Sequence, residues 1–170
     1  MTKCGSFFPL RILGVDPGSH LAGYGVIQCS SIHSMELIDC GFIQLPAELS
    51  LADRLHALYK ALLELLGRHK PTVAALETQY MGKNSQSTIK LAMARAAIVL
   101  AARCEQVQVE EYTPSQVKQA VSGRGSATKE QVQRMVQLLL RLPSLNGPYD
   151  VADALAIAIC HHHRSHRVKP

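Results

Sequence analysis

Four carboxylates in this sequence of 170 residues occupy positions from which they could act on one substrate. Two of them, Asp150 and Asp153, open the apolar stretch "YDVADALAIAIC" at residues 149–160. Residues three apart share one face of a helix, and two carboxylates at a separation of ~4 Å repel by about 4 kcal/mol at an effective dielectric near 20, unless a cation or a proton intervenes. The same pair also suits N-terminal capping and the positive end of the helix dipole. Taken alone, the two positions leave capping and function equally open.

The other two carboxylates each close an apolar segment with the composition of a buried strand. Asp16 ends "ILGVD" and Glu77 ends "VAALE". Ligand crevices of open α/β sheets lie at the carboxyl ends of the strands, so neighbouring strands would bring these two acids together. Each acid could equally be a turn residue, and "DPG" is a favourable turn sequence.

Convergence of all four acids would create a site for hard divalent cations. Mg²⁺ prefers oxygen ligands and keeps waters that substrate phosphates can replace. Two such ions about 3.5–4 Å apart can activate water and stabilise the leaving oxygen in phosphodiester cleavage. The pattern therefore predicts a metal-dependent nuclease site.

The elements that must position these acids follow from hydrophobic periodicity and turn signals. Three strands in an antiparallel meander are expected first, followed by two strands that alternate with helices. The expected strands are 10–16, 22–30, 35–45, 72–77 and 107–112. The expected helices are 50–69, 85–103 and 127–142. A short helix is expected to start at 113 or 114, and the last helix is expected to start at 149. This order predicts one α/β domain with a mixed five-stranded sheet and helices on both faces.

The long helix is expected to do more than cover the sheet. Its segment "LAMARAAIVLAA" at residues 91–102 is apolar all round except for Arg95. One face can pack on the sheet, and an exposed apolar face on the other side would indicate an interface with a second copy of the chain. Ala97 and Val99 are expected to point outward, although a helix buried wholly within one domain remains an alternative.

Charge and cysteine usage narrow the class of protein further. Between residues 80 and 141 there are nine basic residues against four acidic ones, an excess equal to the net charge of +5 for the whole chain. A pI near 9.1 with such clustering indicates a polyanionic partner. Five widely spread cysteines without a CxxC pair predict reduced thiols, hence a cytoplasmic protein rather than a disulfide framework or a zinc site. The apolar N-terminal stretch is too short and interrupted to predict a signal or membrane segment.

Four blocks of sequence resemble consecutive blocks of the RuvC family of bacterial Holliday junction resolvases. They are "ILGVDPGSHLAGYGVI", "LETQYMGKNSQSTIKLAMARA", "TPSQVKQAVSGRGSATKEQVQRMV" and "DVADALAIAICH", which together cover about residues 11–163. The resemblance implies an RNase H-like fold, a homodimer, and Mg²⁺-dependent paired nicking of four-way DNA junctions. Two Mg²⁺ per active site are expected, with Mn²⁺ able to substitute. It also implies work alongside the RuvA–RuvB branch-migration complex and no membrane association.

The resemblance also assigns roles to individual positions. The acidic site of the family falls on Asp16, Glu77, Asp150 and Asp153. Lys118 and Lys129 match basic residues near the scissile phosphate, and Lys118 is counted with the catalytic groups.

The remaining DNA-binding positions belong to loops. Tyr80 falls where an aromatic stacks on an unpaired base, although packing under its loop is an equal alternative. Lys83 and Arg124 are further DNA-binding candidates. The loop "SGRGS" at 122–126, with a helix start at Ser126, would approach phosphate through backbone N–H groups or serve simply as a helix–helix turn.

The chain ends are expected to lie outside this domain. Residues 1–10 are interpreted as an N-terminal extension, 11–163 as the nuclease domain and 164–170 as a flexible tail. The three histidines at 161–163 could act as metal ligands or bases near an acidic site, or form a frayed helix end.

Two other classes of protein compete with a nuclease. The "GVDPGS" and "GYGVI" segments also resemble the phosphate-binding hairpin of actin-like kinases and ATPases, but those folds need two such domains. A non-catalytic DNA-binding module would use the basic region alone, but four acids beside a polyanion weaken binding unless a metal neutralises them. Divalent-dependent nicking of a labelled junction separates these alternatives, whereas ATP turnover would favour the kinase-like one.

Overall fold

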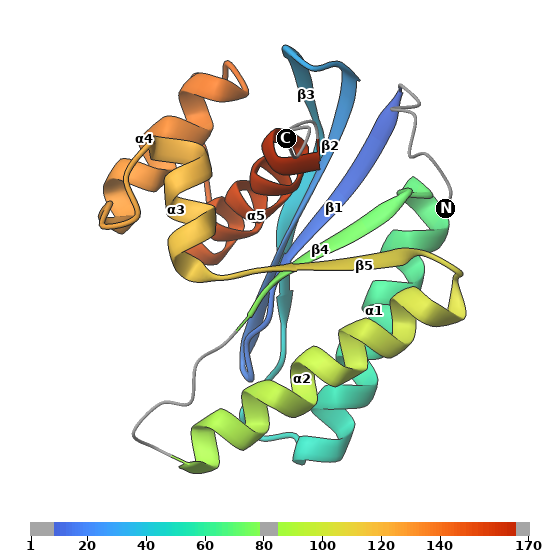
Figure 1. Ribbon diagram of the computed structural model, residues 1–170. Coiled ribbons are helices and arrows are strands. Elements are labelled where there is room, and N and C mark those ends of the chain that lie inside the picture. The colour runs from blue at the N-terminus through green and yellow to red at the C-terminus, as the bar shows by residue number, and fades with distance from the viewer. Residues whose placement is uncertain (1–8, 79–84, 166–170) are drawn as a thin grey trace.

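A single five-stranded sheet with helices on both faces forms the molecule (Figure 1). The computed structural model describes residues 9–78 and 85–165. The strands are β1 (Leu10–Asp16), β2 (Leu21–Ser31), β3 (Ser34–Gln44), β4 (Val73–Glu77) and β5 (Gln108–Tyr112). The helices are α1 (Leu51–His69), α2 (Ser85–Cys104), α3 (Pro114–Ser122), α4 (Lys129–Leu139) and α5 (Tyr149–Ser165). The first strand begins at Leu10 and the last helix ends at Ser165, whereas the predicted domain is 11–163, and that division stays a prediction.

The sheet order is β3-β2-β1-β4-β5, and its topology confirms the mixed sheet expected from the sequence. The short turns keep β1, β2 and β3 antiparallel, while the helical crossovers make β4 parallel to β1 and β5 parallel to β4. Parallel neighbours need a long crossover connection, which α1 and α2 supply. The carboxyl ends of β1, β4 and β5 consequently meet at one end of the sheet.

Two apolar cores lie on the two faces of the sheet. One core packs α1 and α2 against residues such as Leu13 and Val26, and the other packs α3, α4 and α5 against residues such as Ile12 and Ile27. Every residue of α5 from Ala154 to Cys160 is buried, as its unbroken apolar sequence predicts, and His161 and His162 are buried as well. None of the described helices is both long and apolar enough to cross a membrane.

Glycines in β1 and β2 let α5 lie unusually close to the sheet. Gly14 and Gly25 are opposite each other in the β1–β2 register, and Gly23 is opposite Asp16. A Cβ on Gly14 would lie 2.0 Å from the carbonyl oxygen of Ala154, and one on Gly23 would lie 2.0 Å from that of Asp150. These three glycines therefore form a shallow trough, here called the glycine trough, in which the helix backbone rests on the sheet backbone.

The helix ends follow the local chemistry of their residues. Ser50 caps α1, and Thr113 and Thr128 form capping boxes at the starts of α3 and α4. The helix after the "SGRGS" loop thus covers Lys129–Leu139, rather than starting at Ser126 or covering 127–142 as expected. The reason is that Thr128 with Gln131 provides the capping pair. The preceding helix ends at Ser122 and is capped by Gly123, whose φ of 76° suits a residue without a side chain.

The long helix α2 differs in detail from its expected orientation. Val99 packs against the core and Ala97 is partly buried, so these two are not the outward positions. The outward stripe consists of Ile89, Met93, Ala96 and Leu100. Its spacing of four, three and four residues follows one helix face. Periodicity alone could not fix the rotation of a helix that is apolar on every side.

The glycine trough generates a prediction about stability. Gly14→Ala should lower the free energy of unfolding by about 3 kcal/mol or more, because the added methyl group meets backbone rather than a movable side chain. Gly67→Ala is the matched control. Nothing lies within 4 Å of the Cβ it would add inside α1, so it should raise stability by roughly 0.5–1 kcal/mol. Urea denaturation measures both, and equal effects of the two substitutions would contradict close packing at Gly14.

Candidate active site

Three elements deliver the four acids to the same end of the sheet. Asp16 and Glu77 are the last residues of the neighbouring parallel strands β1 and β4. Asp150 and Asp153 lie in the first two turns of α5, which crosses this end of the sheet. The expected convergence of strand ends with the helix start is therefore present.

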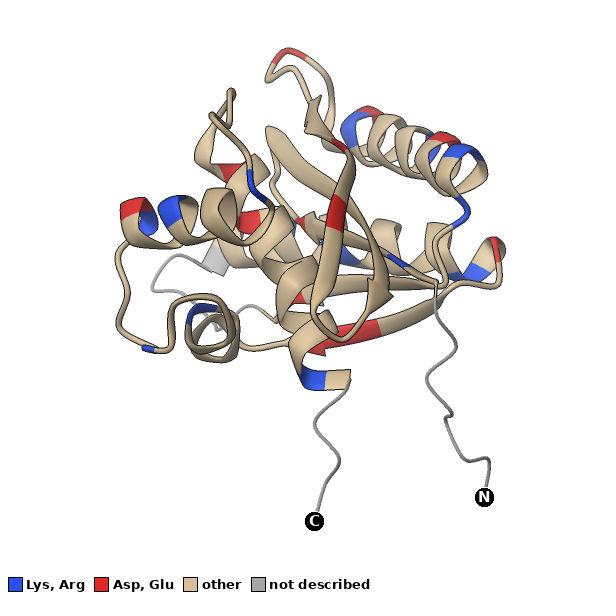
Figure 2. Cartoon of the chain, turned by 90° about the horizontal axis from the view of Figure 1, so that it is seen from above, with Lys and Arg blue, Asp and Glu red and all other residues tan. Residues whose placement is uncertain are grey.

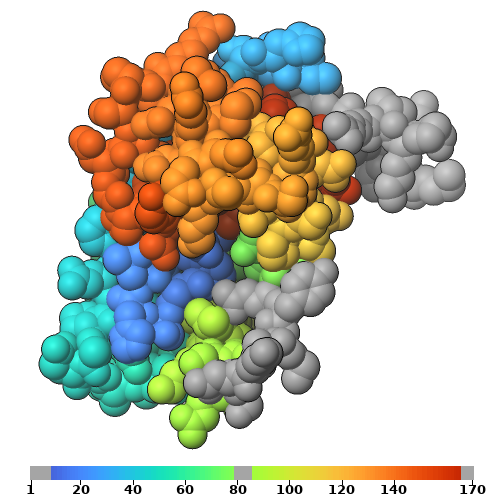
Figure 3. All heavy atoms as spheres, turned by 90° about the vertical axis from the view of Figure 1, so that its left-hand side faces the viewer, coloured from blue at the N-terminus to red at the C-terminus, as the bar shows by residue number. Residues whose placement is uncertain are grey.

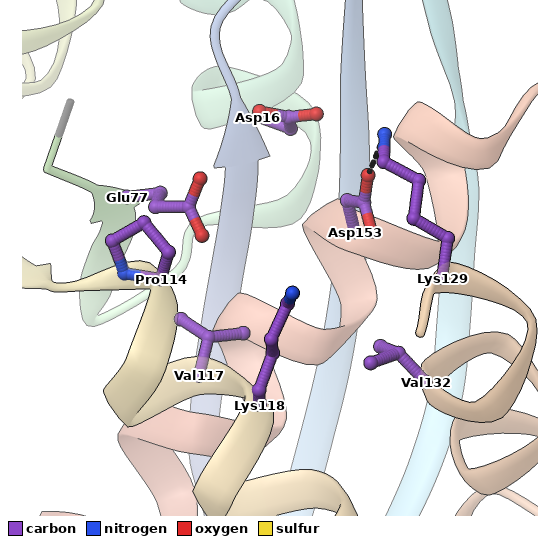
Figure 4. Close-up of a pocket in the computed structure, with 8 residues that line it drawn as sticks. All are labelled: Asp16, Glu77, Pro114, Val117, Lys118, Lys129, Val132 and Asp153. Atoms are coloured by element: carbon purple, nitrogen blue, oxygen red, sulfur yellow. Dashed lines mark hydrogen bonds and ion pairs between the residues drawn. The ribbon is translucent and has the colours of Figure 1, made fainter. Parts of the chain in front are cut away.

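Three of these acids line one pocket of about 210 Å³ together with two lysines (Figure 4). Asp16, Glu77 and Asp153 turn their carboxylates toward the shared space, and Lys118 and Lys129 extend into it from α3 and α4. Figure 3 looks onto this end of the molecule, where the β1–β2 region lies between α3 and α4 on one side and the start of α2 on the other.

The pocket also has an apolar wall that the sequence did not reveal. Pro114, Val117 and Val132 line it beside the charged groups. The residues of this wall look like ordinary core positions of amphipathic helices, so nothing in their types or spacing could have identified them. Their effect is to keep the carboxylates in partly apolar surroundings.

Asp150 lies beside the pocket rather than in its lining. Its charge is close enough to raise the pKa of Asp16. The helix begins at Tyr149, so Asp150 lies within the first turn instead of at the cap, and no side-chain hydrogen bond to it occurs among the described residues. Capping therefore does not explain this carboxylate.

Burial and mutual repulsion perturb the acids strongly. Burial, followed by the charges of Asp153, Glu77 and Asp150, raises the pKa of Asp16 to about 8. Burial and the charge of Asp153 also raise the pKa of Glu77, while Lys118 and Lys129 act in the opposite direction. Near neutral pH the site thus favours either a bound proton or a bound cation at Asp16.

The two lysines supply only part of the missing positive charge. Lys129 donates a hydrogen bond from Nζ to Oδ2 of Asp153 at 3.2 Å, and the charge of Asp153 raises the pKa of Lys129. The Lys129 side chain is 63% exposed, so it can leave this partner at little cost. Lys118 reaches the pocket without an ion pair among the described residues.

The donor set suits a hard divalent cation. All the candidate ligand atoms are carboxylate oxygens, the atoms that Mg²⁺ prefers, and their crowding disfavours the ionised site without added positive charge. Among the described residues, however, no three His, Cys, Asp or Glu side chains already form a metal-binding group.

The other predicted DNA-binding residues are outside this pocket. Arg124 is exposed on the turn between α3 and α4. The backbone N–H groups of Gly123 and Arg124 donate to Gln119 and Ser122, which favours the helix–helix turn over a phosphate-binding loop. Tyr80 and Lys83 lie outside the described residues, so their roles stay predictions.

The three histidines belong to the folded end of α5. His161 and His162 are buried, and His161 shares a hydrogen bond of 2.7 Å with the Tyr112 hydroxyl. His163 contacts the carbonyl oxygen of Ala120 on α3. The helix end is therefore not frayed, and none of the three histidines lines the acidic pocket.

Comparison with known proteins gives one consistent result. Residues 12–161 match the family model described as crossover junction endodeoxyribonuclease RuvC. The chain is 46% identical over 154 residues to the RuvC protein of Pelotomaculum thermopropionicum, covering 91% of this chain and 93% of that relative. It is also 46% identical over 152 residues to RuvC of Shewanella frigidimarina, covering 89% and 86% of the two chains.

Solved structures agree with the sequence relatives. T. thermophilus RuvC in complex with a Holliday junction substrate superposes with a TM-score of 0.87 at 32% identity, covering 92% of this chain and 94% of that one. The yeast mitochondrial Holliday junction resolvase Ydc2 shares the fold with a TM-score of 0.65 at 14% identity. The chain is therefore an endodeoxyribonuclease with an RNase H-like fold. It belongs to the RuvC family of crossover junction endodeoxyribonucleases.

The raised pKa of Asp16 generates a prediction about pH. The folded protein holds this proton up to a pH of about 8, whereas the unfolded chain releases it near 3.8, so the stability it contributes is lost as the pH rises between these values. In EDTA, the melting temperature of wild type should fall from pH 5 to pH 8.5, and Asp16→Asn should reduce that fall. At pH 8.5 the variant should melt roughly 3 °C or more above wild type.

The matched control is Glu64→Gln, which removes an exposed carboxylate on α1. Its melting curve should follow wild type across the same pH range. Calorimetry gives all three curves, and parallel profiles for Asp16→Asn and wild type would show that Asp16 is not crowded.

Proposed function

We propose that this chain resolves four-way DNA junctions by paired, metal-dependent phosphodiester nicks, with Asp16, Glu77, Asp150 and Asp153 as the metal ligands. One observation carries the proposal: in a chain of this family, three carboxylates from three separate elements line one pocket, and the charge of the fourth reaches it. The T. thermophilus relative was solved with a Holliday junction substrate, which is the substrate class proposed here.

The proposed metal is Mg²⁺, with two ions per site and Mn²⁺ as a substitute. When bound, such ions activate the attacking water and stabilise the leaving oxygen. The chain contributes the oxygen ligands, holds them at the end of a rigid sheet and surrounds them with the apolar wall of Pro114, Val117 and Val132.

Lys118 and Lys129 are the proposed phosphate contacts. Both reach the pocket from helices that rest on α5, so their ammonium groups lie beside the acids. In this proposal Lys129 exchanges its ion pair with Asp153 for a phosphate oxygen when DNA and metal are present. Lys118, which also lowers the pKa of Glu77, neutralises charge at the scissile phosphate.

The DNA backbone beyond the pocket would follow the basic helices. Residues 113–148 carry five basic side chains and a single acidic one. Lys118 is on α3, and Lys129 and Arg134 are on α4. Figure 2 shows the Lys and Arg positions of the chain in blue. Arg124 is proposed to contact phosphate here, and Tyr80 and Lys83 are proposed to contact DNA as well. Such contacts position a substrate without reading its sequence.

The active form is proposed to be a homodimer joined through the outward stripe of α2. Ile89 and Leu100 are 58% and 60% exposed, and Met93 is 41% exposed, which is a costly arrangement for a monomer. The stripe is on the opposite sheet face from α5, so pairing would leave the acidic pocket open. Two sites related by a two-fold axis fit the two nicks that a four-way junction requires.

The cellular setting is proposed from the family resemblance alone. The chain would work in the cytoplasm, alongside the RuvA–RuvB branch-migration complex, during recombination and repair. Association of the purified proteins on a junction tests this part separately.

One prediction of this proposal tests the metal ligands. Changing Asp16, Glu77, Asp150 or Asp153 singly to its amide should reduce Mg²⁺-dependent nicking of a labelled four-way junction by on the order of a hundredfold or more, because a charged ligand is lost. Junction binding in EDTA should survive, since the basic helices are intact. Calorimetry with Mn²⁺ should show weaker metal binding in each variant.

Glu64→Gln again serves as the control and should nick like wild type. Substantial cleavage by Asp16→Asn would remove this residue from the metal site. Nicking of linear duplex as fast as the junction, by wild type, would contradict the proposed substrate.

Another prediction of this proposal tests the dimer. Met93→Glu and Leu100→Glu place a charge in the outward stripe of α2, so each should give a folded monomer in sedimentation and lose the coordination of the two nicks. Leu138→Glu is the matched control, because Leu138 is 63% exposed on α4, away from this stripe. A wild-type monomer at micromolar concentration would rule out the interface.

A further inference from the structure

Two exposed aromatic rings lie beside the acidic site. Among the described Phe and Tyr residues, Phe42 is 46% exposed and Tyr149 is 43% exposed. The other three, Tyr24, Tyr59 and Tyr112, are buried or partly buried. Single exposed apolar residues are ordinary. Phe42 and Tyr149, however, lie at the same corner of the molecule.

The strand register places Phe42 in the same row as the acids. Asp16 is opposite Gly23 in the β1–β2 pair, and Gly23 is opposite Phe42 in the β2–β3 pair. Directly opposite residues point to the same face of a sheet, so Phe42 is on the α5 face with Asp16. Two strand spacings separate their backbones, which is about 10 Å.

Tyr149 reaches the same corner from the helix. It is the first residue of α5, and the carbonyl oxygen of its neighbour Asp150 lies against Gly23, where a Cβ would be only 2.0 Å away. Gly23 is the residue between Asp16 and Phe42 in the row. The start of α5 therefore lies next to Phe42, with one ring on the strand and the other on the helix.

The two flanks of the acidic site differ in chemistry. Lys118 is on α3, which follows β5 at one edge of the sheet, whereas Phe42 is on β3 at the other edge. Ammonium groups suit phosphate, and exposed ring faces suit nucleobases, whose stacking on aromatic side chains tolerates any base. A strand whose phosphate is held at the acids would carry its nearby bases past the β3 flank.

We propose that Phe42 and Tyr149 form a stacking surface for an unpaired nucleobase of the DNA substrate, within a few nucleotides of the scissile phosphate. This inference rests on the proposed function, because it takes the acids as the place where the DNA backbone is cut. The surface would hold a base that the centre of a junction exposes, and so would favour junctions over paired duplex.

The absence of tryptophan from the sequence provides a direct test. Phe42→Trp introduces a single indole at the proposed surface, and its fluorescence should be quenched when a four-way junction is added in EDTA, where the DNA is bound but not cut. Ile38→Trp is the matched control. Ile38 is 39% exposed on the same strand, four residues away or about 13 Å, and its emission should not change.

Affinity gives a second readout. Phe42→Ala should weaken junction binding by about tenfold, and Phe42→Tyr should recover most of the loss because the ring face is restored. Ile38→Ala should bind like wild type. Circular dichroism checks that each variant is folded, which is expected because the substituted positions are exposed.

The outcomes separate this inference from the proposed function. If wild type binds and nicks junctions but the indole of Phe42→Trp is not quenched and Phe42→Ala binds normally, the stacking surface is wrong and the nuclease site stands. If wild type neither binds nor nicks junctions, the proposed function fails and the inference fails with it.

Discussion

The close contact between α5 and the glycine trough is the constraint on which the site depends. The helix backbone reaches the sheet because Gly14 and Gly23 have no side chains, and the carbonyl oxygens of Ala154 and Asp150 occupy the space that a Cβ would take. Every larger residue would lift the helix and with it both of its carboxylates. The helices α3 and α4 pack in turn against α5, so the two lysines of the pocket also inherit their positions from this contact. This one contact between the backbones of α5 and the sheet thus places the acids and the lysines together.

The same helix stabilises an arrangement that its charges oppose. Burial and the charges of Asp153, Glu77 and Asp150 raise the pKa of Asp16, and burial and the charge of Asp153 raise the pKa of Glu77, so an ionised, metal-free site works against folding. The apolar body of α5 offsets this cost. Side chains such as Leu155 and Ile159 are fully buried, and each contributes about 1.5–3 kcal/mol relative to exposure. A crowded site can therefore persist in the folded protein, ready to gain stability from any cation that binds it.

Separate faces of the sheet serve separate parts of the proposed function. The α5 face carries the acidic pocket, its lysines and the two exposed rings, while the opposite face carries α2 with its outward apolar stripe. A substitution on one face need not disturb the other, because the sheet separates the two apolar cores. In this proposal, the lysines would contact phosphate, the rings would contact bases, and the aliphatic stripe of α2 would contact a second copy of the chain.

The sequence by itself determined the elements and the types of side chain at the candidate site. Alternation, turn residues and capping pairs such as Thr113 with Gln116 depend on interactions within a few residues, so the strands and helices could be predicted closely. Asp16 and Glu77 could be linked to one site because parallel strands align their ends. The rotation of α2 about its axis could not be predicted, because a helix that is apolar on every side has no polar face to orient it. Val99 proved to face the core. The sequence also could not predict the apolar pocket wall, the placement of Asp150 just outside the pocket or the row of opposite residues that joins Phe42 to Asp16. These depend on strand register and on how closely backbones approach, which are set by contacts between residues far apart in the chain and so only by the tertiary structure.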